Sequence, residues 1–388
     1  MSISAIFQKK FGKKPEKLFR SPGRVNIIGE HTDYHDGFVL PTAINLGMTW
    51  AGAKRKDRTI RGYTEKLDEI GQFSILDHHR TKYEWMLYLQ GVVEVLKRRN
   101  INVRGVDFAV SSDIPIGSGL SSSSSLATGF TFILNELYKL GLNRKEIARI
   151  ACEAEWWYGT TGGIMDQFCI ANGKKGFALW LDTRSLDYEL IKFPTELEIV
   201  VLETTTRHKQ INSPFALRKE QAQKVVDIAA RIFIPRKIRN LRDITAQMLI
   251  SIKPNILGEY GSKNGDIFYN RALHPIAENL RVQKMKVALI QEDYKTIGQL
   301  LFESHQSLQY NYEVSCKELD IAVGIANSFS ELLGARMIGG GFGGCTLNLV
   351  GKGQGRLFAD KLEKEFNKKT GLKGKTYLCL PSDGVRVI

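Results

Sequence analysis

The segment SPGRVNIIGEHTDYHDGFVLP, from Ser21 to Pro41, carries far more polar groups than an ordinary strand–turn–strand needs. Within thirteen residues lie many charged or hydrogen-bonding side chains, among them Arg24, Asn26, Glu30, His31, Thr32, Asp33, Tyr34 and Asp36. Three glycines, Gly23, Gly29 and Gly37, are interleaved with them. The question is which ligand would need so many donors and acceptors on so short a length of chain.

Length and composition set the broad class. At 388 residues the chain exceeds the size at which one hydrophobic core stops growing, which predicts two domains. The five cysteines are scattered, without a C-x-x-C pair, as expected for reduced thiols in a cytoplasmic protein. The N-terminus lacks the apolar core of a signal peptide, and no run of 18 apolar residues occurs, so we expect no membrane segment.

The net charge of +14 raises the possibility of nucleic-acid binding. The Lys and Arg residues are spread along the chain, however, without the interleaved aromatic residues of a single-strand binder. No helix-turn-helix or zinc-finger spacing occurs either. We therefore favour a solvated basic surface, helped by a phosphate-rich ligand, and expect no nucleic-acid partner.

Hydrophobic periodicity predicts strands and helices that are segregated instead of alternating regularly, which favours an α+β fold in both halves. A switch near residue 180 predicts domains 1–180 and 181–388. Strands are predicted at 38–40, 48–53, 106–110, 198–202 and 375–380, with a strand–glycine loop–strand at 335–350. Helices are predicted at 85–98, 215–232, 282–290, 294–305, 315–330 and 356–368.

A second segment, IPIGSGLSSSSSLATGFTFIL from Ile114 to Leu134, has the pattern of a phosphate-binding loop. Its glycines let the backbone approach a ligand, and the serines that follow run directly into an apolar helix. The free N–H groups and positive dipole at a helix N-terminus would then face an anion. A Ser-rich helix cap or flexible linker is the alternative. The pattern is not a Walker loop, because G-x-x-x-x-G-K-[ST] is absent.

Two further segments add glycines and a carboxylate. GARMIGGGFGGCTLNLV, from Gly334 to Val350, has five glycines in six positions, which suggests backbone packed on a ligand or another loop; a flexible hairpin is the alternative. In ACEAEWWYGTTGGIMDQFCIANG, from Ala151 to Gly173, Glu155 falls on a helix that starts near Asn143. Asp166 follows a glycine turn among apolar residues, as a general base or substrate-orienting group would. A helix cap is the alternative for Asp166.

These segments, in this order, resemble the GHMP family of small-molecule kinases. The first resembles the galactokinase signature G-R-V-N-[LI]-I-G-E-H-T-D-Y-x-x-G-x-V-L-P at nearly every position from Gly23 to Pro41. The others resemble P-x-G-x-G-L-S-S-S, G-I-M-D-Q and A-R-M-x-G-G-G-F-G-G-C. The resemblance runs the length of the chain. It implies a two-domain fold of mixed sheets and helices, with the active site in the cleft between the domains.

The resemblance also implies an activity. It is that of an ATP-dependent sugar 1-kinase, converting galactose and ATP to galactose 1-phosphate and ADP, the first committed step of galactose catabolism by the Leloir pathway. A monosaccharide is a dense ring of hydroxyls, which answers the opening question. The residues that the resemblance implies for sugar binding are Glu30, His31, Thr32, Asp33, Gly163 and Phe215.

For phosphoryl transfer, the resemblance implies that Asp166 orients or deprotonates the C1 hydroxyl, while Arg24 stabilises the developing charge. Ser123 and Glu155 would ligate Mg²⁺ through hard oxygens. The segment that would wrap the ATP phosphates comprises Gly117, Ser118, Gly119, Leu120, Ser121, Ser122 and Ser123.

Two departures leave the sugar open between galactose and N-acetylgalactosamine or another C1-phosphorylated sugar. Phe215 stands where galactokinases commonly have a sugar-contacting Tyr. The stretch EWWYGTTGGIMD, from Glu155 to Asp166, is one residue shorter than in many galactokinases and is similar to the N-acetylgalactosamine kinase branch. We favour galactose. A non-catalytic sugar sensor on the same fold is a further alternative, disfavoured because Arg24, Asp166 and the serine loop are all present. A monomer or weak oligomer is expected.

Overall fold

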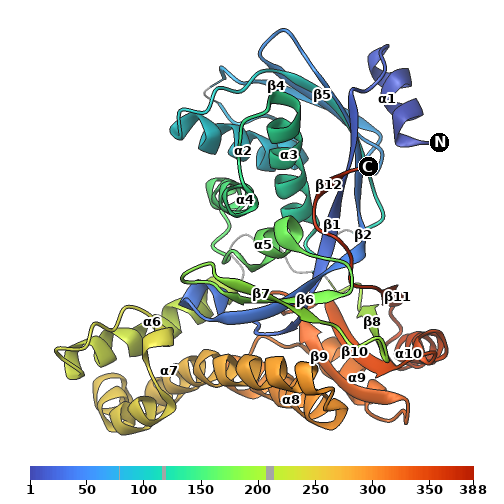
Figure 1. Cartoon of the computed structure of the whole chain (residues 1–388). Coiled ribbons are helices and arrows are strands. Elements are labelled where there is room, and N and C mark those ends of the chain that lie inside the picture. The colour runs from blue at the N-terminus through green and yellow to red at the C-terminus, as the bar shows by residue number, and fades with distance from the viewer. Residues whose placement is uncertain (78, 116–118, 207–213) are drawn as a thin grey trace.

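The structure is a computed structural model that describes residues 1–77, 79–115, 119–206 and 214–388, without the side chains of Pro214 and Phe215. Two β-sheets, each with helices packed on it, lie one above the other, and two long antiparallel strands of the upper sheet run down toward the lower one (Figure 1). Both halves therefore combine mixed or antiparallel sheets with segregated helices, and the predicted α+β class is confirmed.

The first sheet has eight strands among the described residues, in the order β12-β1-β2-β5-β3-β4, with β6 paired to β2 and β7 to β6. Neighbouring strands are antiparallel except for the parallel pair β3 and β5. The strands are β1 (Lys17–Ile28), β2 (Phe38–Lys54), β3 (Thr59–Thr64), β4 (Glu69–Ser74), β5 (Val106–Ser112), β6 (Phe177–Asp182), β7 (Tyr188–Lys192) and β12 (Arg386–Val387). The segment from Ser21 to Pro41, here named the sugar-signature segment, thus occupies the end of β1, the turn after it and the start of β2.

Helices pack on this sheet and against one another. They are α1 (Ile3–Phe11), η1 (Asp33–His35), η2 (Glu84–Met86), α2 (Leu87–Arg98), α3 (Ser122–Tyr138), α4 (Arg144–Tyr158) and α5 (Met165–Asn172). The start of α4 was predicted correctly: the Asn143 side chain accepts the Glu146 N–H, and the Glu146 carboxylate accepts the Asn143 N–H. Apolar residues bury most of α3 in the core, including Phe130 and Leu134, and this fixes its serine-rich N-terminus.

The second sheet has the order β11-β8-β10-β9. Its strands are β8 (Leu197–Glu203), β9 (Leu332–Ile338), β10 (Cys345–Gly351) and β11 (Lys375–Cys379), and its helices are α8 (Tyr294–Gln306), η4 (Ser307–Tyr312), α9 (Lys317–Ala326) and α10 (Gly355–Thr370). Phe358 and Phe366 of α10 pack on Val200 and Leu202 of β8 in a core of their own. The predicted strand–glycine loop–strand is thus β9, residues 339–344 and β10.

A helical layer completes the molecule: α6 (Pro214–Ile232), η3 (Leu241–Asp243) and α7 (Ala246–Gln291). The sequence predicted α6 but only the last turns of α7. Pro254, Pro275 and Gly261 argue against a continuous helix, and the backbone indeed leaves helical geometry at Gly261 (φ 73°). Packing of the apolar faces of α6 and α7 against each other outweighs these breakers.

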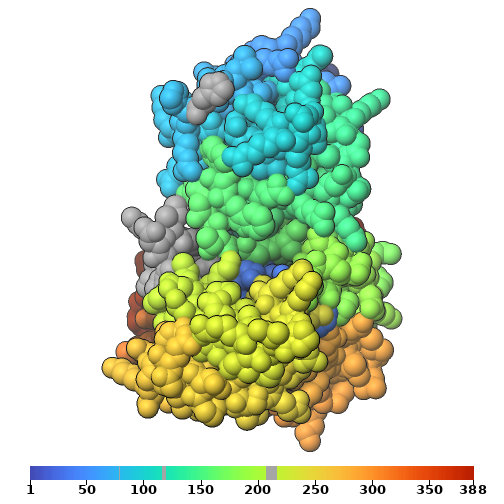
Figure 2. All heavy atoms as spheres, turned by 90° about the vertical axis from the view of Figure 1, so that its left-hand side faces the viewer, coloured from blue at the N-terminus to red at the C-terminus, as the bar shows by residue number. Residues whose placement is uncertain are grey.

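The two halves are interleaved near the predicted boundary. Residue 180 lies inside β6, which pairs with β2, and the chain returns at β12 to pair with β1. The boundary near 180 therefore stays a prediction. In Figure 2, blue atoms from the start of the chain are visible in a furrow between the green upper half and the yellow α6–α7 layer. No helix in the described ranges has both the length and the apolar character needed to cross a membrane.

Candidate active site

One cavity of about 770 Å³ brings the separate sequence segments together. The sugar-signature segment, the start of α3, the turn between α4 and α5 and the glycine loop after β9 all line it. The lining includes Arg24, Glu30, His31, Asp33, Gly119, Ser121, Ser122, Ser123, Glu155, Gly163, Asp166 and residues 339–344. Segments more than three hundred residues apart in sequence therefore share one site.

Arg24 and Asp166 form the most closely held polar cluster in the cavity. Arg24, on β1, donates from Nε and Nη2 to the two carboxylate oxygens of Asp166, each at 2.7 Å. Its Nη1 donates to the carbonyl oxygen of Gly119 at 2.7 Å, and Ser121 Oγ donates to Asp166 Oδ2 at 2.6 Å. The Arg24 side chain is 5% exposed, so this pair is a strong, charge-assisted contact in fixed geometry.

The structure distinguishes between the two interpretations of Asp166. The N-cap residue of α5 is Ile164, and Asp166 lies in the first turn with its carboxylate directed at Arg24 and Ser121. An acidic side chain in a first helical turn is also favoured by the helix dipole. The carboxylate nonetheless faces the cavity, where it can meet a ligand.

The start of α3 has the geometry expected of an anion-binding turn. Gly119 has a φ of 76°, and Ser121, the N-cap residue, has the left-handed φ of 62° that is uncommon for a residue with a side chain. Such strain is often found at functional sites. Ser122, Ser123 and Ser124 follow and line the cavity, so the N–H groups of the first helical turn face it. Leu120 is buried in the core, and Gly117 and Ser118 lie outside the described residues.

Asp33 is held directly over the α4–α5 turn. Its carboxylate accepts the backbone N–H of Met165 at 3.2 Å and of Tyr34 at 3.1 Å. A Cβ on Gly163 would lie 2.2 Å from Asp33 Cγ, so only glycine permits this approach. Burial, and then the neighbouring Asp166, raise the pKa of Asp33 to about 6. The Asp33 carboxyl therefore gains its proton at a higher pH than an ordinary aspartate does.

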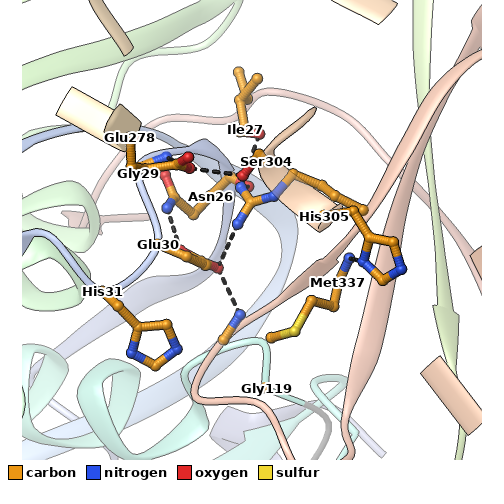
Figure 3. A network of polar contacts seen from close by, with 12 residues as sticks. Asn26, Ile27, Gly29, Glu30, His31, Gly119, Glu278, Ser304, His305 and Met337 are labelled. Carbon is orange, nitrogen blue, oxygen red and sulfur yellow. Dashed lines mark hydrogen bonds and ion pairs between the residues drawn. The ribbon is translucent and has the colours of Figure 1, made fainter. Parts of the chain in front are cut away.

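Glu30 lies deeper in the cavity wall. One of its carboxylate oxygens accepts the Gly339 N–H at 2.6 Å, and the other accepts from the Asn26 side-chain amide (Figure 3). Burial raises the pKa of Glu30, and the cations Arg336 and Arg24 oppose that rise. Glu30, a predicted sugar-binding residue, therefore contacts the glycine loop after β9, a partner that the sequence did not predict.

His31 and Thr32 have different surroundings. His31 Nδ1 lies 2.7 Å from the Tyr34 hydroxyl, which is 3.0 Å from the Tyr312 hydroxyl. Burial lowers the pKa of His31 well below its ordinary value, so the ring is neutral in the cavity wall. Thr32 lies behind the wall, with its hydroxyl within hydrogen-bonding distance of the Gly29 and Phe38 carbonyl oxygens at 2.8 and 2.7 Å. Thr32 thus fixes the turn instead of facing the cavity.

Glu155 and its neighbours provide oxygen atoms beside the serine helix. Glu155 Oε1 accepts from Gln167 Nε2 at 2.8 Å, and burial, with Asp166, raises the pKa of Glu155 to about 7. Gln167 Oε1 is buried and has no hydrogen-bond partner among the described residues. No group of three or more His, Cys, Asp or Glu side chains in the described ranges is arranged to hold a metal ion.

The glycine loop after β9 packs against other loops as well as lining the cavity. A Cβ on Gly341 (φ 83°) would lie 2.2 Å from the carbonyl oxygen of Val314. On Gly343 (φ 140°) it would lie 2.5 Å from the carbonyl oxygen of Thr206. The glycine loop is therefore packed backbone and not a flexible hairpin.

Sequence reasoning missed the apolar end of the cavity. It is lined mainly by Met48, Leu67, Trp85, Tyr88, Val110, Leu126 and Trp156. These residues come from three strands or turns and four helices, with no local spacing that links them. The Phe215 prediction falls outside the described side chains, although α6 begins beside the cavity, where Ala216 is a lining residue.

Comparisons with known proteins match this organisation. A model of the galactokinase galactose-binding signature matches residues 5–54, and models of the GHMP kinases N terminal and C terminal domains match residues 87–174 and 285–368. A galactokinase of Chloroflexus aggregans is 38% identical over 395 residues, spanning 100% of this chain and 97% of that protein. The chain belongs to the galactokinase family.

Solved structures agree with membership of the galactokinase family. Lactococcus lactis galactokinase complexed with galactose superposes with a TM-score of 0.91 at 29% identity, covering 99% of this chain and 98% of that one. Methanococcus jannaschii mevalonate kinase, at 21% identity and a TM-score of 0.62, covers 94% of this chain and 98% of that one and shows the shared fold. The predicted GHMP-kinase fold and kinase class are confirmed, the non-catalytic sensor is not favoured, and ATP is the co-substrate that a kinase requires.

Proposed function

We propose that this chain transfers the γ-phosphoryl group of ATP to the C1 hydroxyl of galactose, forming galactose 1-phosphate and ADP. The observation that carries the proposal is the Arg24–Asp166–Ser121 cluster, which lies in one cavity between the sugar-signature segment and the serine-rich helix start. The similarity to a galactokinase complexed with galactose supports the choice of sugar.

On the sugar side, Glu30, Asp33 and His31 offer acceptors and a neutral ring within a largely buried wall. The Gly163 backbone lies beside Asp33, so a hydroxyl there would meet both a carboxylate and main-chain groups. A buried polar group that loses its partner costs about 1–3 kcal/mol. The site would therefore reject epimers whose hydroxyls point elsewhere.

For the transfer, Asp166 accepts the proton of the C1 hydroxyl as the C1 oxygen bonds to the γ-phosphorus. The bond from that phosphorus to the β–γ bridging oxygen breaks, and ADP leaves. Arg24 stays fixed between Asp166 and the Gly119 carbonyl, close to the transferring group, and stabilises its negative charge. The contacts between Arg24, Asp166 and Gly119 hold both side chains in a fixed arrangement.

On the nucleotide side, the N–H groups at the start of α3 would bind phosphate oxygens, with the segment from Gly117 to Ser123 around them. Ser123 and Glu155 would hold Mg²⁺, with Gln167 Oε1 as a further hard oxygen within the same wall. A Glu155 carboxyl with a pKa near 7 and an unpartnered buried oxygen fit a cation that also binds substrate phosphates. The ion would supply neutralisation of phosphate charge.

The experiment is a coupled ADP-release assay with MgATP and, in parallel, galactose, N-acetylgalactosamine, glucose and talose. The proposal expects galactose to have the highest kcat/KM, with phosphate on C1 of the product. Higher kcat/KM for N-acetylgalactosamine would make the amino sugar the substrate instead, and no turnover of any sugar would refute the kinase assignment to this cavity.

We further propose a cytoplasmic location and a monomeric or weakly oligomeric state. The scattered cysteine pattern, which suits a reducing compartment, supports the cytoplasmic location. Sedimentation of the purified chain at micromolar concentrations would reveal a stable oligomer.

A further inference from the structure

A fully buried arginine, Arg336, connects the second sheet to the sugar-signature segment. It lies on β9, is 0% exposed, and donates from Nη1 to the carbonyl oxygens of Ile27 at 3.0 Å and Asn26 at 3.3 Å. Its Nη2 lies 3.6 Å from Glu30 Oε1. Burying a guanidinium is expensive unless it is paired and hydrogen-bonded, so an arginine at a strand position otherwise suited to an apolar residue implies a specific task.

The partner of Arg336 is a carboxylate that faces the cavity. Glu30 is 1% exposed, and its carboxylate oxygens are shared among Gly339, Asn26 and Arg336. Figure 3 shows Glu30 below Asn26 and beside His31. Without a nearby cation, such a buried carboxyl would lose its charge or turn toward solvent. Arg336, which does not line the cavity, supplies that positive charge together with Arg24.

The same carboxylate also fixes the glycine loop. Gly339 is its first residue, with a φ of 82°, and its N–H donates to Glu30 Oε1 at 2.6 Å. A Cβ on Gly339 would lie 3.5 Å from the carbonyl oxygen of Gly119, so the two glycine segments lie side by side. That carbonyl accepts from Arg24 Nη1. Contacts therefore run from Arg336 through Glu30, Gly339 and Gly119 to Arg24.

From this chain of contacts we infer that Arg336 is a positioning residue that couples the two substrate sites. It holds Glu30 toward the sugar and, through the Glu30–Gly339 hydrogen bond, sets the glycine loop against the phosphate loop. The inference rests on the proposed function for the identity of the two substrates. Arg336 touches neither substrate itself, and its effect passes through Glu30.

The guanidinium shape explains why lysine would serve less well. Arg336 Nη1 donates to two carbonyl oxygens while Nη2 faces the Glu30 carboxylate at 3.6 Å, and the planar guanidinium holds these two nitrogens in fixed relative positions. An ammonium keeps the charge but cannot reproduce all three contacts. Arg336→Lys should therefore restore part of what Arg336→Gln loses.

The test compares Arg336→Gln, Arg336→Lys, Glu30→Gln and the Arg336→Gln/Glu30→Gln double variant by steady-state kinetics with galactose and MgATP. Arg336→Gln should raise KM for galactose about tenfold or more and KM for ATP several-fold, as expected when one partner of a buried ion pair is removed. The double variant should be no worse than the worse single variant, because Arg336 acts through Glu30. Arg336→Lys should fall between Arg336→Gln and the native chain.

The matched control is Arg55→Gln. Arg55 pairs at 2.8 Å with Asp107, a buried carboxylate, and neither residue lines the cavity. This variant should lower the melting temperature while leaving both KM values unchanged. A folded Arg336→Gln with the same behaviour as the control, or fully additive effects in the double variant, would overturn the inference.

Two further outcomes are informative. If neither Arg336 variant folds, Glu30→Ala decides, because it deletes the acceptor of the Gly339 N–H; an unchanged KM for ATP in that variant overturns the coupling. A native chain that phosphorylates no sugar refutes the proposed function. A native chain that phosphorylates galactose, with variants of unchanged KM, refutes only the assignment to Arg336.

Discussion

Replacing Asp166 by Asn tests the centre of the proposed mechanism. The substitution keeps the side chain's shape but leaves one oxygen where two now accept hydrogen bonds from Arg24 at 2.7 Å each. It also removes the proton acceptor for the C1 hydroxyl. Loss of a general base lowers kcat by about 10²–10⁴. The buried Arg24 simultaneously loses its counter-charge, which should reduce the free energy of unfolding by about 1–3 kcal/mol.

These two effects can be measured separately. The coupled assay gives kcat at saturating galactose and MgATP, calorimetry gives the ATP affinity, and thermal melts give stability. Ser121→Ala is the control, because it removes only the 2.6 Å hydrogen bond to Asp166 Oδ2 and should lower kcat by about tenfold at most. If Asp166→Asn binds ATP normally and keeps kcat within about tenfold of native, Asp166 only positions Arg24 and the base mechanism is refuted.

Three further substitutions test the surrounding wall. Because burial and Asp166 raise the pKa of Asp33 to about 6, kcat/KM for galactose should fall as the pH drops through 6 and the carboxylate acceptor is lost. Asp33→Asn should give a low kcat/KM without that transition. A native pH profile of kcat/KM that is flat from pH 5 to 8 contradicts this prediction. Gly163→Ala places a Cβ 2.2 Å from Asp33 Cγ and should raise KM for galactose about tenfold or more while leaving KM for ATP unchanged in the same assay. Thr32→Val should cost about 1 kcal/mol of stability in urea melts without altering the ranking of sugars, and a changed ranking would place Thr32 in the sugar site after all.

The sequence predicted the parts of the site whose chemistry is local. The Ser21–Pro41 segment, the glycine–serine turn before α3 and the Gly163–Asp166 turn each carry their pattern within a few residues, and each lines the cavity. The helix start at Asn143 was equally local, because a capping box needs only two side chains. The starts and ends of such elements depend on residues that contact their near neighbours in the chain.

Long-range convergence could not be predicted in this way. Trp85 of η2 and Leu67 of the β3–β4 turn are far apart in the sequence, and both reach the cavity only through the fold of the first sheet and the helices around it. Helix α7 forms across Pro254 and Pro275 because α6 covers its apolar face, a tertiary effect that outweighs local propensity. Arg336 gives no local signal at all, since one arginine in an apolar strand equally suggests a solvent-facing position.

The charges lining the cavity bear on how the nucleotide binds. Among the described lining residues, two cationic side chains, Arg24 and Lys66, face four carboxyl groups, those of Glu30, Asp33, Glu155 and Asp166. The expectation that a phosphate-rich ligand helps to account for the net charge of +14 therefore finds little support in this wall. A highly charged triphosphate would instead meet a surplus of negative groups, which the helix dipole of α3 offsets only in part.

The charge balance predicts that ATP needs a divalent cation to bind. Removing Mg²⁺ with EDTA should weaken ATP affinity by about tenfold or more, because at an effective dielectric constant of about 20 two like charges about 6 Å apart repel by about 3 kcal/mol. Glu155→Gln should narrow the difference in affinity between MgATP and free ATP. The substitution removes the carboxylate proposed to hold the ion, and with it one negative charge. Calorimetric titrations of both nucleotide forms at two salt concentrations check this. Equal affinity for ATP with and without EDTA in the native chain would contradict the proposed cation site and require Arg24, Lys66 and the α3 N-terminus to neutralise the phosphates alone.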